Sequence, residues 1–523
     1  MRVELTLLYF VFLGILVSFA ETNDSAHSPT ISINSGQIRG VILSDGSANF
    51  LGIPYAQPPM GNLRWHEPVP PKPWSGVRDA KEFGAPCAQS VYGDWNRRNA
   101  EASQEDCLYL NVLTPEWPVK APLPVMFWLH GGGNTGGTAS SSLYKDGTLQ
   151  KHGVVLVTVN YRLGVFGFLA HPELTAESAH HASGNYALMD QIAALQWVHD
   201  NIAKFGGDPN NVTVFGQSAG ALDTGLLMTS PLAKGLFRRA IAESGTVLLG
   251  HWPRLSEAEQ QGAKLAASLK APSTDAVKFL RGLSTADLLK ATIDSSPSVI
   301  VDGWVLTRAP ALVFATGQEA AIPLLLGNNT REFDAPATPD ELRARIQERF
   351  GPLAPQALNI YGLANGAAGN NDALYGPAAN QLAADTMFRC PATSVAQWHK
   401  QAHHPTYEYQ FEHAIPGQES EGAVHSADLP YVFGFFPKEG NIGGKFGEID
   451  RKIAEIIESY WTNFARTGDP NGESLTKWPE FGDTESFVSI TQDGQVEAKT
   501  KLRAPQCDLY RDNIKRRFFA AAR

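Results

Sequence analysis

Long apolar runs are scarce in this chain of 523 residues. One run of apolar character, Leu5 to Val17, lies near the N-terminus, and it is shorter than the roughly 20 apolar residues that a membrane-spanning helix needs. Every later hydrophobic stretch is broken within a few residues by a charged residue, Gly or Pro. We therefore expect no membrane span in the mature chain.

The residues around this N-terminal run have the features of an export signal. Arg2 precedes the run, and residues 18–20 (SFA) form a small-x-small cleavage site after it. These features predict a signal peptide over residues 1–20 and a mature chain that begins near Glu21. A single-span anchor is the alternative interpretation. We expect the protein to be secreted or periplasmic.

Long blocks of basic residues are also missing. Acidic residues outnumber basic residues, 53 against 43, and Lys and Arg are dispersed along the chain. A protein that follows a nucleic-acid backbone needs clustered positive charge, so we do not expect nucleic acid as a partner. Repeats and low-complexity linkers are lacking too, so nothing marks a division of residues 21–523 into several domains.

Cysteine is scarce, with four residues, Cys87, Cys107, Cys390 and Cys507. An even number in an exported chain favours disulfides, although counting alone leaves three possible pairings. Buried free thiols are the alternative. A zinc site built on these cysteines is less favoured, because none has a nearby Cys or His at ligand spacing.

An alternation of strand and helix patterns occupies the first half of the chain. Residues 123–130 (LPVMFWLH) and 154–160 (VVLVTVN) are apolar runs of strand length. Over residues 186–205 apolar side chains recur every three or four positions, which predicts a helix that ends at Gly206. A further strand is predicted at 212–215. This alternation predicts an α/β fold with a mostly parallel sheet that is covered by helices on both faces.

The signals are less regular in the second half of the chain. Ser256 and Glu259 have the spacing of a capping box, which predicts a helix that opens there. Further helices are predicted at 339–350 and 449–466, and strands at 322–326 and 406–411.

A serine in a G-x-S-x-G pattern is the first residue with a chemical signature. Residues 216–220 (GQSAG) follow a predicted strand and precede a helix-compatible run, which is the context of a nucleophile on a sharp turn. Small residues are needed at the ends of this pattern, because Cβ atoms there would meet the adjacent strand and helix. The N-terminus of the helix favours negative charge near Ser218. Ser244, in the segment AESG, is the rival serine, but it lacks this pattern and is interpreted as structural.

Consecutive glycines end an earlier predicted strand, at residues 130–133 (HGGG). Backbone without side chains can turn its N–H groups toward a substrate carbonyl oxygen. The N–H groups of Gly132 and Gly133, together with that of Ala219, are therefore predicted to form an oxyanion hole. A flexible glycine loop, extended by residues 136–137, is the alternative.

These motifs resemble the type B carboxylesterase family, which includes cholinesterases and related lipases. The resemblance spans nearly the whole mature chain, and its ordered matches are 51–54 (LGIP), 63–65 (LRW), 105–111 (EDCLYLN), 130–133, 160–169 (NYRLGVFGFL), 184–185, 190–191 and 205–220 (FGGDPNNVTVFGQSAG). It implies the α/β-hydrolase fold, which is a large mixed, mostly parallel sheet flanked by helices. It also implies that residues 21–523 form a single catalytic domain.

In this family the nucleophile, the acid and the base follow one another in that order along the chain. Glu332, after the predicted strand at 322–326, matches the acid, and His425, in the segment GAVHSADLPYVFG, matches the base. The resemblance therefore implies a catalytic set of Ser218, Glu332 and His425. The chemistry explains these residue types, because the histidine must take the serine proton and the carboxylate must fix the tautomer of the imidazole.

The sequence departs from the family pattern at three positions. Gln217 stands where Glu is common, so a negative charge beside the nucleophile is missing. Phe333 stands where Gly commonly follows the acid, which makes Asp334 a rival of Glu332. Asn134 replaces an aromatic or small apolar residue after the glycines and is a candidate for binding a polar substrate, with an ordinary loop residue as the alternative.

The resemblance also implies pairs of residues. The implied disulfides are Cys87 with Cys107 and Cys390 with Cys507. The implied buried ion pairs are Arg64 with Glu105 and Arg162 with Asp190.

The sequence thus predicts a hydrolase of small-molecule carboxylic esters that works through an acyl-Ser218 intermediate and needs neither a metal nor an organic cofactor. An inactive binding protein of the same group is the competing hypothesis, and the intact set of Ser218, Glu332 and His425 argues against it. A lipase or an amidase would share the same attacking groups.

Overall fold

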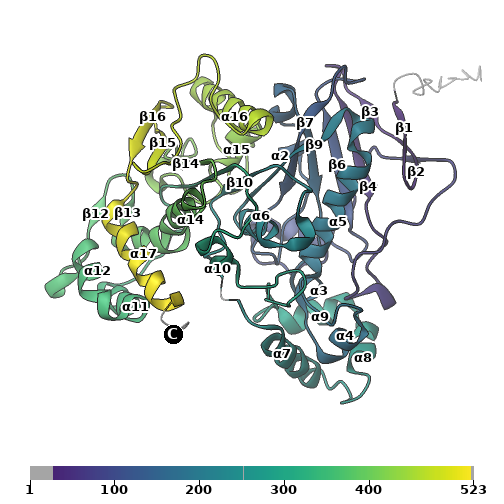
Figure 1. Ribbon diagram of the computed structural model, residues 1–523, viewed down its shortest axis with the longest axis horizontal. Coiled ribbons are helices and arrows are strands. Elements are labelled where there is room, and N and C mark those ends of the chain that lie inside the picture. The colour runs from purple at the N-terminus through teal and green to yellow at the C-terminus, as the bar shows by residue number, and fades with distance from the viewer. Residues whose placement is uncertain (1–27, 251, 520–523) are drawn as a thin grey trace, which may run out of the picture.

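The computed structural model describes residues 28–250 and 252–519, so the predicted signal peptide lies outside the described residues. A mixed sheet of 11 strands forms the centre of the molecule (Figure 1). Its spatial order is β16 (Val496–Thr500), β15 (Ser486–Ile490), β14 (Thr406–Phe411), β11 (Leu324–Asn329), β10 (Arg239–Glu243), β9 (Gly207–Gln217), β7 (Leu123–Leu129), β8 (Val155–Val159), β6 (Tyr109–Thr114), β4 (Ala48–Pro54) and β3 (Val41–Ile42). From β15 to β8 neighbouring strands are parallel, and at both edges they are antiparallel. This large, mostly parallel sheet confirms the predicted fold class.

Two small sheets lie outside the central one. They are formed by β1 (Thr30–Ile33), β2 (Gly36–Arg39) and β5 (Val77–Asp79), and by β12 (Asn371–Asp372) and β13 (Gly376–Pro377). The helices are α1 (Asp94–Glu101), α2 (Ser142–Lys145), α3 (Gly164–Phe168), α4 (Pro172–Glu177), α5 (Tyr186–Asn201), α6 (Ala219–Thr229), α7 (Leu255–Ser268), α8 (Ala276–Gly282), α9 (Thr285–Thr292), α10 (Pro310–Ala315), α11 (Pro339–Phe350), α12 (Ala354–Ile360), α13 (Ala378–Ala384), α14 (Cys390–Gln401), α15 (Leu429–Val432), α16 (Glu448–Thr467) and α17 (Ala504–Phe519).

The central strands are buried on both faces, which is why their sequences are continuous apolar runs. In β7, Phe127 packs into the hydrophobic cluster that includes residues of α5. Its neighbour Trp128 points to the opposite face and packs into the cluster that includes Trp461 of α16. Helices therefore cover both faces of the sheet, as predicted from the alternation of strands and helices.

Most predicted helix ends agree with the structure, and one predicted start is wrong. Gly206 and Gly468 adopt left-handed conformations, with φ of 83° and 86°, directly after the helical residues that precede them. Helix α7, however, begins at Leu255, and the N–H of Arg254 donates to Glu257 Oε2 at 2.9 Å. The predicted capping box of Ser256 and Glu259 is therefore incorrect. The carboxylate of Glu257 caps the helix earlier than predicted, and the N–H of Leu255 donates to the carbonyl of Val301 outside the helix.

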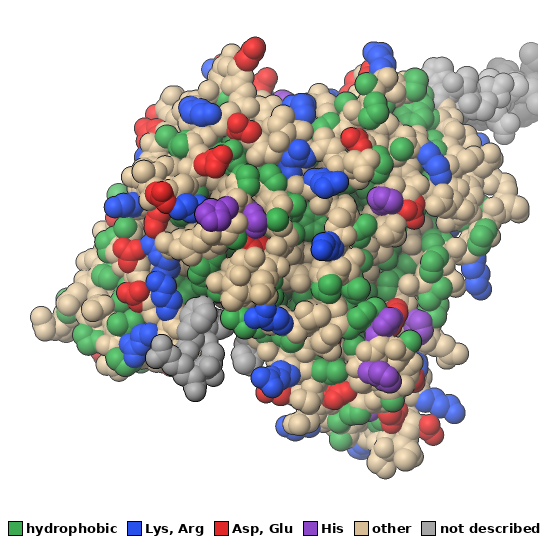
Figure 2. Space-filling view, in the orientation of Figure 1, with side chains coloured by type: hydrophobic (Ala, Val, Ile, Leu, Met, Phe, Trp, Pro, Cys, Tyr) green, Lys and Arg blue, Asp and Glu red, His purple; other side chains and the backbone are tan. Residues whose placement is uncertain are grey.

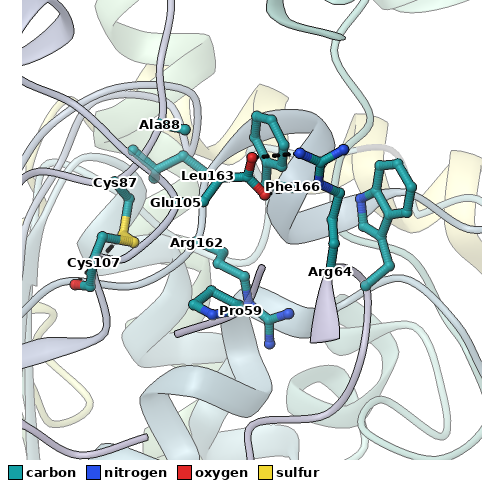
Figure 3. A pocket seen from close by; sticks show the side chains of 10 residues that line it. Pro59, Arg64, Cys87, Ala88, Glu105, Cys107, Arg162, Leu163 and Phe166 are labelled. Atoms are coloured by element: carbon teal, nitrogen blue, oxygen red, sulfur yellow. Dashed lines mark hydrogen bonds and ion pairs between the residues drawn. A yellow bond between two sulfur atoms is a disulfide. The ribbon is translucent and has the colours of Figure 1, made fainter. Parts of the chain in front are cut away.

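Two buried ion pairs tie loops to the sheet, as the family resemblance implied. Arg64 contacts Glu105 at 2.6 Å, and Arg162 contacts Asp190 at 2.7 Å. Figure 3 shows the first pair beside the Cys87–Cys107 disulfide. The cavity that these residues line has a volume of about 10 Å³, which is room for one water molecule at most. We interpret this region as structural.

The four cysteines form two disulfides, Cys87–Cys107 and Cys390–Cys507. The first closes a local loop, which contains α1. The second spans 117 residues and attaches the C-terminal helix α17 to the start of α14. Closing a long loop in this way restricts the unfolded chain and limits fraying of the last helix.

Acidic and basic side chains are interspersed on the surface. Figure 2 shows no continuous basic stripe on the face that it displays. Within residues 28–250 and 252–519, no helix is both long and apolar enough to cross a membrane.

Candidate active site

The residues that the sequence singles out follow the carboxyl ends of three parallel strands. Ser218 follows β9, Glu332 follows β11, and His425 lies in the loop after β14. Because parallel strands present their carboxyl ends at one edge of a sheet, these segments meet although they are far apart in sequence. The structure therefore brings the three predicted residues to one edge of the sheet.

Ser218 lies in a sharp turn between β9 and α6, in an unusual backbone conformation with φ of 58° and ψ of −119°. The turn depends on two glycines. A Cβ atom on Gly216 would lie 2.5 Å from the carbonyl carbon of Gly220, and one on Gly220 would lie 2.0 Å from the carbonyl oxygen of Leu129. The close approach predicted from the sequence is confirmed. Such strain raises the serine above the sheet at the start of the helix, where its oxygen can attack.

His425 and Glu332 form a short hydrogen bond. The Nδ1–H of the imidazole donates to Glu332 Oε2 at 2.6 Å, and the backbone N–H of His425 donates to the Glu332 carbonyl at 2.6 Å. The second carboxylate oxygen, Oε1, accepts from Ser244 Oγ at 2.7 Å and from the N–H of Asn329 at 2.8 Å. Glu332 is 1% exposed, whereas Asp334 is exposed. The carboxylate that contacts the imidazole is therefore Glu332.

Ser244, the rival serine, thus contacts the acid. It is fully buried, and its hydroxyl is committed to Glu332. The sequence contains no local pattern for this contact, because 88 residues separate the two side chains.

The other imidazole nitrogen faces Gln217. Gln217 Nε2 lies 3.2 Å from His425 Nε2, and with Nδ1 protonated the amide is the donor in this hydrogen bond. Gln217 directly precedes Ser218, so this contact joins His425 to the segment that carries the serine. In the sequence, Gln217 stands out only because it replaces a Glu that is common in the family. No sequence pattern indicates that the Gln217 amide contacts His425.

Three backbone N–H groups are available near Ser218. Gly132 and Gly133 adopt φ of 114° and 65°, and their N–H groups have no acceptor among the described residues. Ala219 is the first residue of α6, so its N–H has no acceptor within the helix. A Cβ atom on Gly132 would lie 2.2 Å from the carbonyl oxygen of Gly136, which explains why this loop needs glycine.

Asn134, at the end of the glycine loop, is 7% exposed. Its Nδ2 donates to Asp223 Oδ1 at 2.8 Å, and Gln191 Nε2 donates to Asp223 Oδ2 at 2.6 Å. The Oδ1 of Asn134 has no partner among the described residues. Burial raises the pKa of Asp223 to about 7, against the smaller opposite effect of the two amide donors.

Two aromatic rings pack against the catalytic candidate His425. The ring centroids of Phe333 and Phe388 lie 4.3 Å and 5.0 Å from that of the imidazole. Phe333 is 43% exposed, so its ring forms apolar molecular surface next to the histidine. Phe388 comes from a π-helical turn, Asp385–Arg389, between α13 and α14, and such turns are frequent at functional sites. No sequence pattern points to Phe388.

Two further carboxyl groups are buried near the candidate acid. Burial and the charge of Glu332 raise the pKa of Asp428 to about 6, although Asn329 donates a hydrogen bond to it. Burial and the charge of Asp428 raise the pKa of Glu243, whose Oε1 accepts from Trp461 Nε1 at 2.7 Å.

Within the described residues, the group of three side chains that could hold a metal ion lies elsewhere in the fold.

The comparisons with known proteins agree with this geometry. Residues 27–510 match the model of the "Carboxylesterase family". The chain is 37% identical to a fumonisin B1 esterase of Sphingopyxis macrogoltabida, over 88% of this chain and 86% of the relative. It is 35% identical to a medium-chain fatty acyl-CoA hydrolase precursor of Anas platyrhynchos, over 95% of each chain. It is also 35% identical to a cocaine esterase of Homo sapiens, over 91% of this chain and 90% of the relative.

A match over nearly the whole chain, on a sheet of the expected kind, identifies the family. The protein belongs to the carboxylesterase family and is an enzyme that hydrolyses carboxylic esters.

Proposed function

We propose that this protein is a secreted carboxylesterase that acts through an acyl-serine intermediate, with Ser218 as nucleophile, His425 as base and Glu332 as the acid. The observation that carries the proposal is the hydrogen bond between Glu332 and His425 Nδ1. It fixes the tautomer in which Nε2 carries the lone pair, and this lone pair, which accepts from the amide of Gln217 in the free enzyme, turns to Ser218 Oγ for the reaction.

In the first half of the reaction, His425 Nε2 takes the proton from Ser218 Oγ while the oxygen attacks the ester carbonyl carbon. The negative charge moves to the carbonyl oxygen, where the N–H groups of Gly132, Gly133 and Ala219 stabilise it. Loss of one such donor typically costs about 100- to 1,000-fold in rate. The imidazolium then protonates the leaving alcohol, and the acyl group remains on Ser218.

In the second half, water attacks the acyl-serine and His425 takes its proton. Collapse of the second tetrahedral intermediate releases the carboxylic acid and returns the proton to Ser218. Glu332 keeps its charge throughout and stabilises the imidazolium. The reaction thus needs no cofactor.

The substrate is proposed to be a small-molecule ester whose polar part contacts Asn134. Because the Nδ2 of Asn134 is engaged by Asp223, this role falls to its Oδ1, which has no partner among the described residues. The exposed ring of Phe333 would contact apolar parts of the substrate on the other side of His425.

Secretion is proposed from the N-terminal sequence and from the two disulfides, which persist in oxidising compartments. We further propose that residues 21–523 form a single catalytic domain, with the loops and the shorter helices as excursions from one sheet.

Covalent labelling tests the nucleophile. An organophosphate should modify Ser218, as mapped by peptide mass spectrometry, and Ser218→Ala should lower ester hydrolysis by roughly 10,000-fold or more without unfolding the chain. Ser244→Ala is the matched control and should still be labelled at Ser218. Modification of a different serine in the unaltered protein would contradict the assignment.

A further inference from the structure

Glu319, His399 and His404 come together at the opposite edge of the sheet from Ser218. Glu319 precedes β11, and His404 precedes β14, so both lie at the amino ends of these neighbouring parallel strands. His399 lies in the last turn of α14, which packs beside α10 and β14 (Figure 1). Each of the three side chains offers one ligand atom, and these atoms lie within 4.8 Å of one another.

His399 is oriented as a metal-binding histidine would be. Its Nε2–H donates to the carbonyl of Ile322 at 2.8 Å, and its Nδ1 lies 2.8 Å from Glu319 Oε1. Histidines that bind metals typically donate their other ring N–H to a carbonyl or a carboxylate, which fixes the tautomer. Here the carbonyl of Ile322 serves that purpose and directs Nδ1 toward Glu319.

One carboxylate oxygen of Glu319 is left without a hydrogen-bond donor among the described residues. The residue is 6% exposed, and its Oε2 has no partner among the described residues. A buried carboxylate oxygen without a partner is costly, and a bound cation would satisfy it.

His404 is held close to His399 by the backbone, because its N–H donates to the carbonyl of His399 at 3.2 Å. The two ring centroids lie 4.8 Å apart. His404 is partly exposed, so the cluster is accessible to an ion from solvent and a water molecule can complete the coordination.

We propose that Glu319, His399 and His404 bind one divalent transition-metal ion of the zinc type, with solvent as the fourth ligand. Two imidazoles and one carboxylate are a ligand set that suits Zn²⁺, and all four cysteines are committed to disulfides. Such a site would fix the amino ends of β11 and β14 to α14, far from the ester-cleaving edge, and it does not rest on the proposed mechanism.

Binding requires a small adjustment. Ligand atoms about 2.1 Å from a tetrahedral ion lie roughly 3.4 Å apart, so Glu319 Oε1 and His399 Nδ1, which are 2.8 Å apart, must separate slightly as the three ligand atoms, now within 4.8 Å of one another, arrange around the ion. Without the ion, one hydrogen lies between His399 Nδ1 and Glu319 Oε1, which are 2.8 Å apart. The ion takes the place of this hydrogen, which passes to solvent as a proton.

Calorimetry on the mature chain without a polyhistidine tag tests the proposal. After treatment with a chelator, titration with zinc chloride should reveal one ion per chain, and zinc should raise the midpoint temperature of unfolding. His404→Ala should weaken this binding by at least about 100-fold and abolish the shift. His403→Ala is the matched control, because this neighbouring histidine is exposed and is not among the three ligands, and it should bind zinc as the unaltered chain does.

Glu319→Gln should also lose the site, and cobalt should give the visible absorption of tetrahedral coordination in the unaltered chain and in His403→Ala but not in Glu319→Gln. If the buried change at Glu319 prevents folding, His404→Ala decides alone, because it removes a partly exposed loop side chain. The proposal is overturned if no stoichiometric zinc binding occurs, or if His404→Ala and the unaltered chain bind zinc equally. Glu319 and His399 would then be an ordinary buried ion pair.

Discussion

Asp223 Oδ1 accepts a hydrogen bond from Asn134 Nδ2 at 2.8 Å, and this contact joins helix α6 to the loop that carries the candidate oxyanion hole. Because burial raises the pKa of Asp223 to about 7, the folded protein keeps this carboxyl protonated at mildly acidic pH. In the unfolded chain the group ionises near pH 4.

The pH dependence of stability follows from this difference. The contribution of neutral Asp223 is fully present below about pH 4 and is lost as the pH rises to about 7, a loss of up to about 4 kcal/mol. Asp223→Asn should remove this decline, so the variant should gain stability relative to the unaltered protein as the pH rises. Urea unfolding midpoints from pH 4 to pH 8 check this, with the exposed Asp334→Asn as a control. Parallel profiles for Asp223→Asn and the unaltered protein would show that Asp223 takes up no proton on folding.

Glu332→Gln should lower the rate by roughly 1,000- to 10,000-fold while the fold is retained. The carbonyl oxygen of the new amide would stay with its two donors, Ser244 and Asn329, so the NH₂ group would face His425 Nδ1. That arrangement places the imidazole proton on Nε2, which then cannot accept the serine proton. Steady-state hydrolysis of a chromogenic ester measures the effect.

Asp334→Asn is the matched control for this variant, because Asp334 is exposed and two residues away. Its rate should remain close to that of the unaltered enzyme. If Asp334→Asn were instead the crippled variant and Glu332→Gln the active one, the acid would be misassigned.

Gln217→Glu should move the acid limb of the kcat/KM profile to higher pH. The side chain of residue 217 lies within hydrogen-bonding distance of His425 Nε2, and a carboxylate there would favour the imidazolium, which cannot act as the base. Gln217→Met removes the amide donor, which stabilises the neutral imidazole, without adding a charge, so its limb should move in the same direction by a smaller amount. An equal displacement in both variants would mean that the charge at this position is not what sets the limb.

Arg64→Met should lower the free energy of unfolding by about 3 to 5 kcal/mol, because it leaves the buried Glu105 without its partner. Arg39→Met breaks the exposed pair with Asp79 and should cost far less, because solvent screens both charges. Chemical denaturation of both variants measures the difference. Similar small losses in the two variants would show that the buried pair contributes no more than the exposed one.

Local sequence patterns determined much of this fold. The strands 123–129 and 406–411 and the helix 339–350 were predicted closely, because apolar periodicity, glycine at helix ends and turn-forming residues act within a few positions of the chain. The sharp turn at Ser218 was predicted for the same reason, since the adjacent backbone leaves no room for a Cβ atom at Gly216 or Gly220.

The family resemblance added the histidine and the acid, which no local pattern distinguishes among 14 histidines and 53 acidic residues. Only the tertiary structure decided which carboxylate contacts His425, that Ser244 supports this carboxylate, and that the amide of Gln217 reaches the imidazole. It also brought His404 and Glu319, which are 85 positions apart in the sequence, to the amino ends of two neighbouring strands. These contacts depend on the order of strands in the sheet and on which loops meet at its ends. Hydrophobic periodicity encodes neither, because it records only which face of a single helix or strand is covered.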